Sequence, residues 1–387
     1  METVYIVSAV RSAVGKGKKD GALASVHPVE LSAQMMRAAI DEAKVDAATI
    51  DDIYWGCAMP EASQGLNVAR LSSLRAGIPV EVPSATINRF CSSGLQTIAL
   101  GAQAIMTGMA DVVLAGGVEM MSQVPMSGYH TRLDPDATES YIGMGFTAER
   151  VADRWKITRE DQDRWALGSQ QKAAKAIASG TFDKQIVPVS VEETRWKGAK
   201  KETMNQRFAK DELPRPETTI EGLAKLKPAF KAKGTVTAGN ASPYSDGAAA
   251  VLLMSERRMR ELKATPLARF VTFAAAGVDP DIMGVGPIKA VPKALKQAGW
   301  SLADVNVIEF NEAFAAQVCA VIKELGMDES KVNVNGGAIA LGHPLGATGA
   351  KLTTQLVHEL RKRGGGKGMV TMCVGGGMGA AGLFEVA

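Results

Sequence analysis

The sequence contains few of the residues that mark disulfide-rich, metal-binding or membrane-spanning proteins. Its 387 residues include four histidines and four cysteines, Cys57, Cys91, Cys319 and Cys373. These cysteines lie too far apart for a Cys-x-x-Cys metal site, and they lack the close pairing of a disulfide framework. No run approaches the roughly 20 apolar residues that a membrane span requires. We therefore expect reduced thiols, no bound metal and no transmembrane segment.

The excess of positive over negative charge is also small, which argues against a nucleic-acid partner. The formal net charge is +3, and the basic clusters at 16–19 and 361–363 are short. Such clusters are typical of solvated faces. The second residue is acidic, and the apolar run after it is too short for the hydrophobic region of a signal peptide. We expect a cytoplasmic protein whose chain starts with a buried strand.

Aromatic residues make up only 5% of the chain, whereas glycine is abundant, with 40 residues. This balance predicts many tight turns and close approaches of backbone to backbone. The length exceeds that of a usual single domain, so two domain-sized units or a duplicated one are expected.

Strand and helix patterns alternate along the first part of the chain. The predicted strands are 4–9, 53–57, 84–88 and 111–115, and the predicted helices are 28–44, 67–76 and 92–108. This alternation predicts an α/β fold with a buried, largely parallel sheet covered by helices.

The second part of the chain repeats the first at an offset of 255 residues. Residues 39–58 match 294–313 without a gap, apolar residue on apolar residue, and the same offset places Gly94 on Gly349. Agreement across a helix and the strand after it favours an internal duplication. A later helix at 347–363 and strand at 369–373 continue the second unit.

Residues 119–238 interrupt this alternation. They are polar and charged, with a predicted helix at 150–172 and little strand pattern, and a strand at 248–254 then completes the first unit. We therefore predict three parts: an amino-terminal half (1–118 plus 239–265), an inserted loop domain (119–238) and a carboxyl-terminal half (266–387).

Cys91 stands in a turn between a predicted strand and a predicted helix. The N–H groups at the start of a helix stabilise a thiolate, so we expect a lowered thiol pKa and a nucleophilic role. Ser92, Ser93 and Gly94 are small and leave room for a substrate carbonyl. The alternative is a buried structural cysteine.

His343 lies in a second glycine-dense turn, 336–349, and Pro344 biases its backbone towards an extended conformation. It could accept the proton of Cys91 or donate to a developing oxyanion. Asn311 and Glu312 follow a predicted strand, and the carboxyl ends of parallel strands commonly carry functional groups. The alternatives are a structural histidine and an asparagine that caps a turn.

Cys373 is followed by glycines that would let backbone N–H groups approach a reacting oxygen. Residues 377–382 also match G-x-G-x-x-G, but only five residues follow them. No phosphate-binding helix fits there, so we do not expect a dinucleotide site.

Four motifs together resemble the thiolases and, within them, the 3-ketoacyl-CoA thiolases (acetyl-CoA acyltransferases). They occur in order at 88–94, 311–315, 336–344 and 373–379. The resemblance implies the thiolase fold, in which two similar βαβαβαββ halves form a five-layered αβαβα arrangement with an inserted loop domain. This agrees with the duplication found above.

The resemblance also implies a two-step acyl transfer of fatty-acid β-oxidation. Cys91 would attack a 3-ketoacyl-CoA with help from His343, and Cys373 would move protons to and from carbon and CoA. One oxyanion site would use His343 and a water on Asn311, and the other the N–H groups of Cys91 and Gly375. Coenzyme A would be a co-substrate, with no permanently bound cofactor.

Contacts to the acyl-CoA are implied in the same way. Arg215 matches a residue near the adenosine phosphates and Ser242 one near pantetheine. The apolar contacts would be Met144, Leu223, Met283 and Phe314.

Two departures from the short-chain members of the family are informative. Gly143 and Met144 replace a His-Met pair, which favours a broader acyl range. The stretch 121–143 is shorter than the loop that joins dimers into tetramers, so we expect a homodimer. A β-oxidation multienzyme partner is also compatible with the resemblance.

Other functions remain open at this point. The alternative enzyme is acetyl-CoA C-acetyltransferase (acetoacetyl-CoA thiolase), and the alternative from another class is a noncatalytic CoA- or lipid-binding protein. A decarboxylating ketoacyl synthase is disfavoured, since those enzymes carry His or Asn in place of Cys373.

Overall fold

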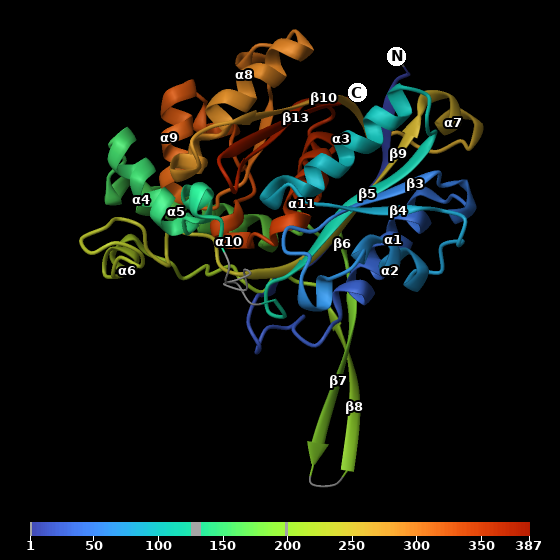
Figure 1. Cartoon of the computed structure of the whole chain (residues 1–387), viewed down its shortest axis with the longest axis horizontal. Helices are drawn as coiled ribbons and strands as arrows, with labels where there is room; N and C mark the ends of the chain where they lie inside the picture. The colour runs from blue at the N-terminus through green and yellow to red at the C-terminus, as the bar shows by residue number, and fades with distance from the viewer. Residues whose placement is uncertain (1, 125–132, 198–199) are drawn as a thin grey trace.

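The computed structural model describes most of the chain (Figure 1). The described ranges are 2–124, 133–197 and 200–387. Within them the backbone alone is described at 139, 193–197, 200–202 and 204. The stretch 121–143, whose shortness predicts a dimer, falls partly outside these ranges. Among the described residues, no helix is both long enough and apolar enough to cross a membrane.

The amino-terminal half follows the predicted alternation. Its strands are β1 (Val4–Ser12), β2 (Gly15–Lys16), β3 (Asp52–Gly56), β4 (Ser84–Ile87), β5 (Val112–Met120) and β9 (Ser245–Ser255). Its helices are α1 (Pro28–Ala43), α2 (Val68–Arg75), α3 (Ser93–Met106) and α7 (Glu256–Glu261). The first helix begins at Pro28, whose fixed φ suits an initial helical turn.

The carboxyl-terminal half repeats this succession. Its strands are β10 (Ala268–Gly277), β11 (Val307–Phe310), β12 (Gly366–Val374) and β13 (Met378–Val386). Its helices are α8 (Pro287–Ala298), α9 (Ala315–Leu325), α10 (Ala338–Leu341) and α11 (Leu345–Lys362). The sequence pattern does not predict β13, because glycine and alanine dominate its first half and give a weak strand signal.

The ten strands of the two halves and β6 (Ile186–Val187) of the inserted region form one 11-stranded sheet. Its main path runs β11-β12-β13-β10-β1-β9-β5-β3-β4. β1, β5, β3 and β4 share one direction, but β9 runs antiparallel between β1 and β5. Likewise β13 runs antiparallel between β10 and β12, and β1 pairs antiparallel with β10 where the halves join. The sheet is therefore less parallel than predicted, because each half closes with a reversed strand.

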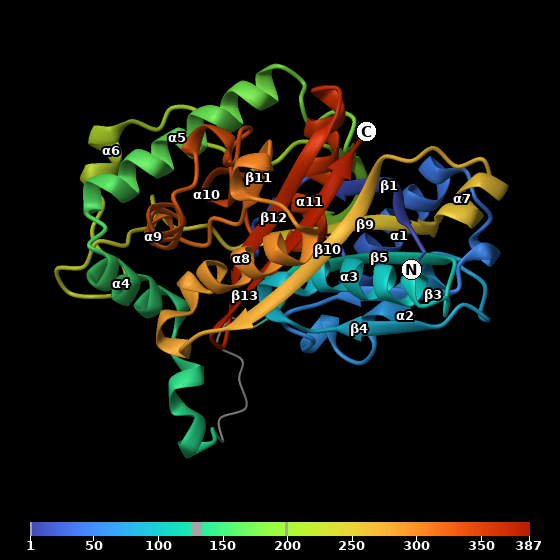
Figure 2. The same ribbon diagram turned by 90° about the horizontal axis from the view of Figure 1, so that it is seen from above.

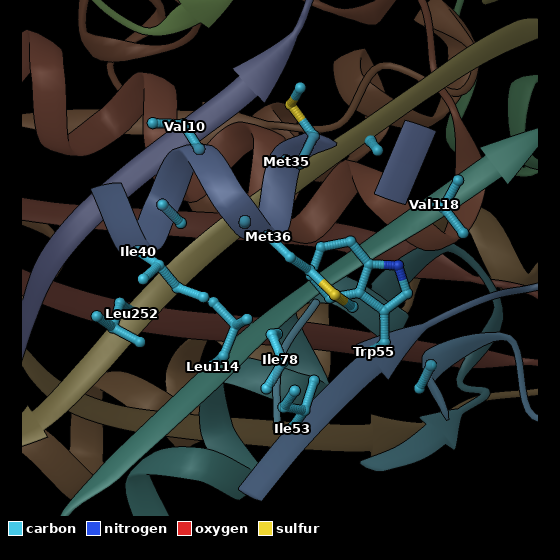
Figure 3. Packing of buried hydrophobic residues seen from close by; sticks show 14 of the residues in the cluster. Val10, Met35, Met36, Ile40, Ile53, Trp55, Ile78, Leu114, Val118 and Leu252 are labelled. Carbon is cyan, nitrogen blue, oxygen red and sulfur yellow. The ribbon is translucent and has the colours of Figure 1, made fainter. Parts of the chain in front are cut away.

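Three hydrophobic cores arrange the helices in layers. α1 and α2 cover the outer face of the amino-terminal strands, and Figure 3 shows Met36 of α1 beside Trp55 of β3. α3 and α11 lie between the halves and pack on strands of both. α8 and α9 cover the outer face of the carboxyl-terminal strands. This confirms the expected five-layered arrangement, in which burial of each large apolar side chain contributes about 2 kcal/mol.

The two halves meet in a reciprocal contact between α3 and α11. A Cβ atom on Gly94 would lie 2.8 Å from the backbone nitrogen of Ala350, and one on Gly349 would lie 2.1 Å from that of Leu95. The predicted offset of 255 maps one pair onto the other, since it places Gly94 on Gly349 and Leu95 on Ala350. The duplication therefore extends to the contact that joins the halves, and the backbones approach closely because these two residues have no side chain.

The inserted region differs from its prediction in two ways. In place of one helix at 150–172 there are two, α4 (Met144–Trp155) and α5 (Arg159–Ala178). Lys156 ends α4 in the left-handed conformation, and Thr158 starts α5 with a capping box to Asp161. The helix caps thus divide a stretch whose periodic pattern of apolar residues predicts one continuous helix.

The inserted region also contains strands that the sequence pattern does not predict. β7 (Val189–Lys197) and β8 (Lys200–Phe208) form a hairpin that projects from the body in Figure 1. β6 (Ile186–Val187) pairs with β1, and α6 (Ile220–Ala224) follows the hairpin. Figure 2 shows α4, α5 and α6 beside the carboxyl-terminal half.

Candidate active site

Cys91 lies in a single 3₁₀ turn, Phe90–Ser92, between β4 and α3. Phe90 has a φ of 42°, a left-handed conformation that is costly for a bulky residue. Two hydrogen bonds hold this shape: Phe90 N–H donates to Asn88 Oδ1 (2.8 Å), and Arg89 N–H donates to Ser93 Oγ (2.9 Å). The turn is therefore shaped by its own polar side chains.

The sulfur of Cys91 is buried, and this overturns the expected lowering of its pKa. Burial raises the pKa of the thiol to about 12. The backbone N–H groups of Gly375 and of Cys91 oppose this by stabilising the thiolate, and the charge of Glu119 adds to the increase. Desolvation thus outweighs the helix start, and the resting thiol is neutral. Gly375 brings the carboxyl-terminal half directly to this sulfur.

His343 lies between α10 and α11 and is fixed from three sides. Its backbone N–H donates to Ser245 Oγ (3.0 Å), and its Nδ1 lies 2.6 Å from Thr348 Oγ1. Its Nε2 lies 3.2 Å from Asn311 Nδ2. Burial, and then the charge of Lys351, lowers the pKa of the imidazole to about 3. His343 is therefore neutral, with one ring nitrogen able to accept a proton.

Asn311 follows β11 and joins this group, as predicted. Its backbone N–H donates to the carbonyl of Thr371 on β12 (3.0 Å). Its Oδ1 is buried without a hydrogen-bond partner among the described residues. A buried acceptor of this kind is costly unless it receives a hydrogen bond, so the arrangement suits a water or a substrate donor.

Cys373 is the next-to-last residue of β12 and is near enough to Cys91 for the charge of one thiol to affect the other. Burial raises the pKa of the Cys373 thiol well above its usual value, and the negative charge of an ionised Cys91 raises it further. Its Sγ lies 3.6 Å from Gln317 Oε1. Two thiols from different halves therefore interact electrostatically within one buried region.

The residues expected to contact acyl-CoA fall into two groups. Met283 and Phe314 are buried in one apolar cluster with Cys373, and Met144 packs against it. Arg215 and Leu223 line a narrow cavity of about 50 Å³, together with Ala238, Gly239 and Ala241. Ser242 connects the groups, because its N–H donates to the carbonyl of Ala313, next to Phe314 (2.9 Å).

Glu312, singled out in the sequence, lies away from His343. Its carboxylate accepts hydrogen bonds from Trp165 Nε1 (3.0 Å), Ser169 Oγ (2.7 Å) and Asn333 Nδ2 (2.8 Å). It also accepts the N–H of Ile339 (3.1 Å). Glu312 thus ties the loop that leads to His343 onto helix α5 of the inserted region.

Sequence reasoning missed three residues around the site. Thr348 and Ser245 hold His343, and neither stands out from the many serines and threonines of the chain. Glu119 is buried near Cys91. A signal for it exists, since a glutamate within the apolar strand β5 requires partners.

Comparisons with known proteins identify the family of the chain. Residues 4–257 match the family model "Thiolase, N-terminal domain", and residues 264–386 match "Thiolase, C-terminal domain". The chain is 53% identical to a Bacillus subtilis (strain 168) protein named 3-ketoacyl-CoA thiolase, over 100% of both chains. It is 47% identical to a Pseudomonas aeruginosa protein named acetyl-CoA acetyltransferase, over 98% of both chains.

Two solved structures have the same fold. The crystal structure of the Bacillus anthracis acetyl-CoA acetyltransferase superposes with a TM-score of 0.91 at 44% identity, covering 100% of this chain and 99% of that one. That of human mitochondrial 3-ketoacyl-CoA thiolase gives a TM-score of 0.89 at 42% identity, with the same coverage. The predicted resemblance is thereby confirmed, and the chain is an enzyme that belongs to the thiolase family.

Proposed function

We propose that the enzyme cleaves 3-ketoacyl-CoA with CoA to acetyl-CoA and an acyl-CoA shortened by two carbons. The observation that carries this proposal is the convergence of two buried thiols, with the N–H of Gly375 bonded to the sulfur of Cys91 and Cys373 beside it. A 53% identical relative named 3-ketoacyl-CoA thiolase supports the same reaction. We assign it to fatty-acid β-oxidation in the cytoplasm.

In the first step, Cys91 is the nucleophile and His343 the base. The Cys91 proton moves to the neutral imidazole as the sulfur attacks carbon 3 of the substrate. The bond between carbons 2 and 3 then breaks, and its electron pair goes to carbon 2 as an enolate. Cys373 protonates that carbon, which releases acetyl-CoA and leaves the shortened acyl group on Cys91.

In the second step, a CoA thiol gives its proton to Cys373 and attacks the acyl carbon. The bond to Cys91 breaks, and His343 returns the proton to the departing sulfur. Both residues end in their starting protonation states, so each cycle is balanced without a further cofactor. Two thiols suit this task because a thiolate is both a good nucleophile and a good leaving group.

Oxygen charge develops in both steps and needs hydrogen-bond donors. We assign one donor pair to the backbone N–H groups of Cys91 and Gly375, which already point at the sulfur. The second site comprises His343 and a water held by the unpartnered Oδ1 of Asn311.

The binding of acyl-CoA is divided between the two groups described above. Met144, Met283 and Phe314 form the apolar wall beside Cys373. Arg215 and Leu223, which line the narrow cavity, would contact CoA together with Ser242, whose N–H donates to Ala313. We also propose the division into 1–118 plus 239–265, 119–238 and 266–387, which places Met144, Arg215 and Leu223 in the inserted domain and the other three contacts in the two halves.

We propose that a second copy of the chain covers the outer edge of β4. β4 ends the sheet, and within the described ranges no further strand pairs with that edge. Leu66 is 91% exposed and Val80 is 65% exposed nearby. An open strand edge beside apolar side chains favours association. Light scattering in solution tests this homodimer; a mass equal to one chain at micromolar concentration contradicts it.

The second candidate function is acetyl-CoA acetyltransferase, which is the printed name of relatives at 46–47% identity. Thiolysis rates on the four-carbon acetoacetyl-CoA and on longer 3-ketoacyl-CoA substrates, followed by the enolate absorbance, separate the two. We expect kcat/KM on longer substrates to equal or exceed that on acetoacetyl-CoA. Turnover confined to acetoacetyl-CoA supports the acetyltransferase, and no turnover supports a noncatalytic CoA- or lipid-binding protein.

A further inference from the structure

Glu119 is a fully buried carboxylate near the end of β5 that the mechanism above does not use. In the amino-terminal half, its Oε1 accepts hydrogen bonds from Gln64 Nε2 (2.6 Å) and the N–H of Met59 (3.2 Å). Its Oε2 accepts the N–H of Ala58 (2.9 Å). Backbone groups of the loop after β3 are therefore held by this one side chain.

The same carboxylate also binds the carboxyl-terminal half. Oε2 accepts the N–H of Gly346, in the first turn of α11, at 2.8 Å. One oxygen thus joins Ala58 and Gly346, whose halves are related by the duplication. Burial raises the pKa of Glu119, whereas Gln64 and the three backbone groups all donate and oppose this increase by stabilising the ionised carboxylate.

The backbones around Glu119 approach so closely that the geometry is tightly fixed. A Cβ atom on Gly346 would lie 2.7 Å from the nitrogen of Ala58. One on Gly117 would lie 2.3 Å from the carbonyl oxygen of Gly346, and one on Gly56 would lie 2.7 Å from that oxygen. Three glycines are thus needed for this approach, and Glu119 supplies the polar connection within it.

Both segments bound by Glu119 lead to residues of the proposed mechanism. The carbonyl of Ala58 accepts a hydrogen bond from Asn88 Nδ2 (3.1 Å), three residues before Cys91. Gly346 lies three residues after His343. Ala58, Cys91 and Leu345 also belong to one small buried cluster. A displaced carboxylate would therefore move the nucleophile and the base relative to each other.

We propose that Glu119 is a positioning residue that aligns the loops of Cys91 and His343 by binding backbone N–H groups of both halves. This inference rests on the proposed roles of Cys91 and His343. Its negative charge has a second consequence, since it contributes to the raised pKa of Cys91. Glu119 thus also helps to keep the resting thiol protonated.

The test is Glu119→Gln, which keeps the shape but places an NH₂ group against N–H donors. We expect kcat for thiolysis to fall about 100-fold with the KM for CoA changed less than about twofold, since the loss is one of alignment. We also expect iodoacetamide to alkylate Cys91 faster at a given pH, because a nearby negative charge is removed. A purely structural role predicts no such change in alkylation.

The matched control is Glu149→Gln. Glu149 is also a buried glutamate that accepts backbone N–H groups, those of Thr235 and Val236, but both lie in the inserted region. We expect its kcat to stay within about twofold of wild type. If Glu119→Gln does not fold, Gln64→Met serves instead, because it leaves the carboxylate in place and removes the side-chain donor to Oε1, together with the Gln64 hydrogen bonds to the Met59 carbonyl and from the Met120 N–H. Its kcat is expected to fall about fivefold.

A kcat within about twofold of wild type in a folded Glu119→Gln enzyme, or an equal loss in Glu149→Gln, overturns the inference. For Gln64→Met, an unchanged kcat does the same. A wild-type enzyme that forms no acyl-Cys91 with acetyl-CoA would instead contradict the proposed function itself. The two failures are therefore distinguishable.

Discussion

The two halves of the molecule share one succession of strands and helices, but they contribute unequally to the site. The amino-terminal half provides Cys91, in the turn before α3. The carboxyl-terminal half provides Asn311, His343 and Cys373, from three different loops or strand ends. The duplicated halves thus share their strands and helices, whereas the loops that carry the candidate catalytic side chains differ between them.

The halves also differ at one strand, and the difference explains where His343 comes from. In the amino-terminal half, β4 pairs with β3 through Ile53 and Ser84. In the other half, Ile308, which the offset relates to Ile53, pairs with Val332 in an isolated bridge. The chain that follows Val332 leaves the sheet, is tied down by Glu312 and carries His343 into the site. A shortened strand therefore leaves free the segment that carries His343.

The largest effect is expected from substitutions at His343 and at its hydrogen-bond partner Thr348, which the carboxyl-terminal half contributes to the site. His343→Ala should lower kcat about 10³-fold, because it removes the proposed acceptor of the Cys91 proton. Thr348→Val keeps the imidazole but removes the partner of Nδ1, so a loss of about tenfold is expected. Steady-state thiolysis measures both. A His343→Ala enzyme within tenfold of wild type would assign the base to another residue.

The next largest effect is expected from a substitution that disrupts the contact between α3 and α11, where the two halves meet. Gly349→Ala places a methyl group 2.1 Å from the backbone of Leu95 and should lower the free energy of unfolding by about 3 kcal/mol. Gly168→Ala is the control, since a Cβ there meets nothing within 4 Å inside α5; it should stabilise the protein by about 1 kcal/mol. Urea unfolding compares them. Equal stability of the two variants would refute the reciprocal packing.

The pH dependence of Cys91 alkylation tests whether burial or the N–H groups at the helix start determine the pKa of this thiol. With the pKa of Cys91 raised to about 12, the thiolate fraction grows up to that pH. Alkylation of Cys91 by iodoacetamide should therefore rise about tenfold per pH unit from pH 7 to 10. An alkylation rate that stops rising near neutral pH would mean that the N–H groups at the helix start outweigh burial and lower the pKa of Cys91. Cys91→Ser controls for reaction at the other cysteines.

The smallest expected effect concerns the inserted region, which belongs to neither half. Gly143 precedes α4, and a Cβ atom there would contact Phe146 at no closer than 3.4 Å, so a side chain has room. Gly143→His should lower kcat/KM on long 3-ketoacyl-CoA about fivefold relative to acetoacetyl-CoA. If the ratio of kcat/KM on the two substrates does not change, residue 143 does not determine the range of acyl chains that the enzyme accepts.

Much of the fold was predictable because it is encoded in local pattern and repeated. The strand and helix alternation, the offset of 255 and the Gly94–Gly349 correspondence all describe the structure. The β7–β8 hairpin and β13 were not predictable, since the hairpin is polar and β13 is rich in small residues. The break between α4 and α5 depends on capping at Thr158, which is invisible to periodicity.

The site shows the same limit. Cys91, His343, Asn311 and Cys373 were recognisable because glycine-dense turns and strand ends mark them. The pKa of Cys91 was not, because its direction depends on burial by both halves, which no local pattern encodes. Glu119 was missed for a related reason: its donors come from residues 57–64 and from Gly346, which are both far from it in the sequence.

The division of labour between the two thiols is tested most directly by the mass of the intact protein after incubation with acetyl-CoA. Cys373→Ser should become acetylated on Cys91 yet fail to cleave 3-ketoacyl-CoA, whereas Cys91→Ser should remain unmodified. Acetylation of Cys91→Ser, or full thiolysis by Cys373→Ser, would contradict the assignment of nucleophile and proton carrier to different halves.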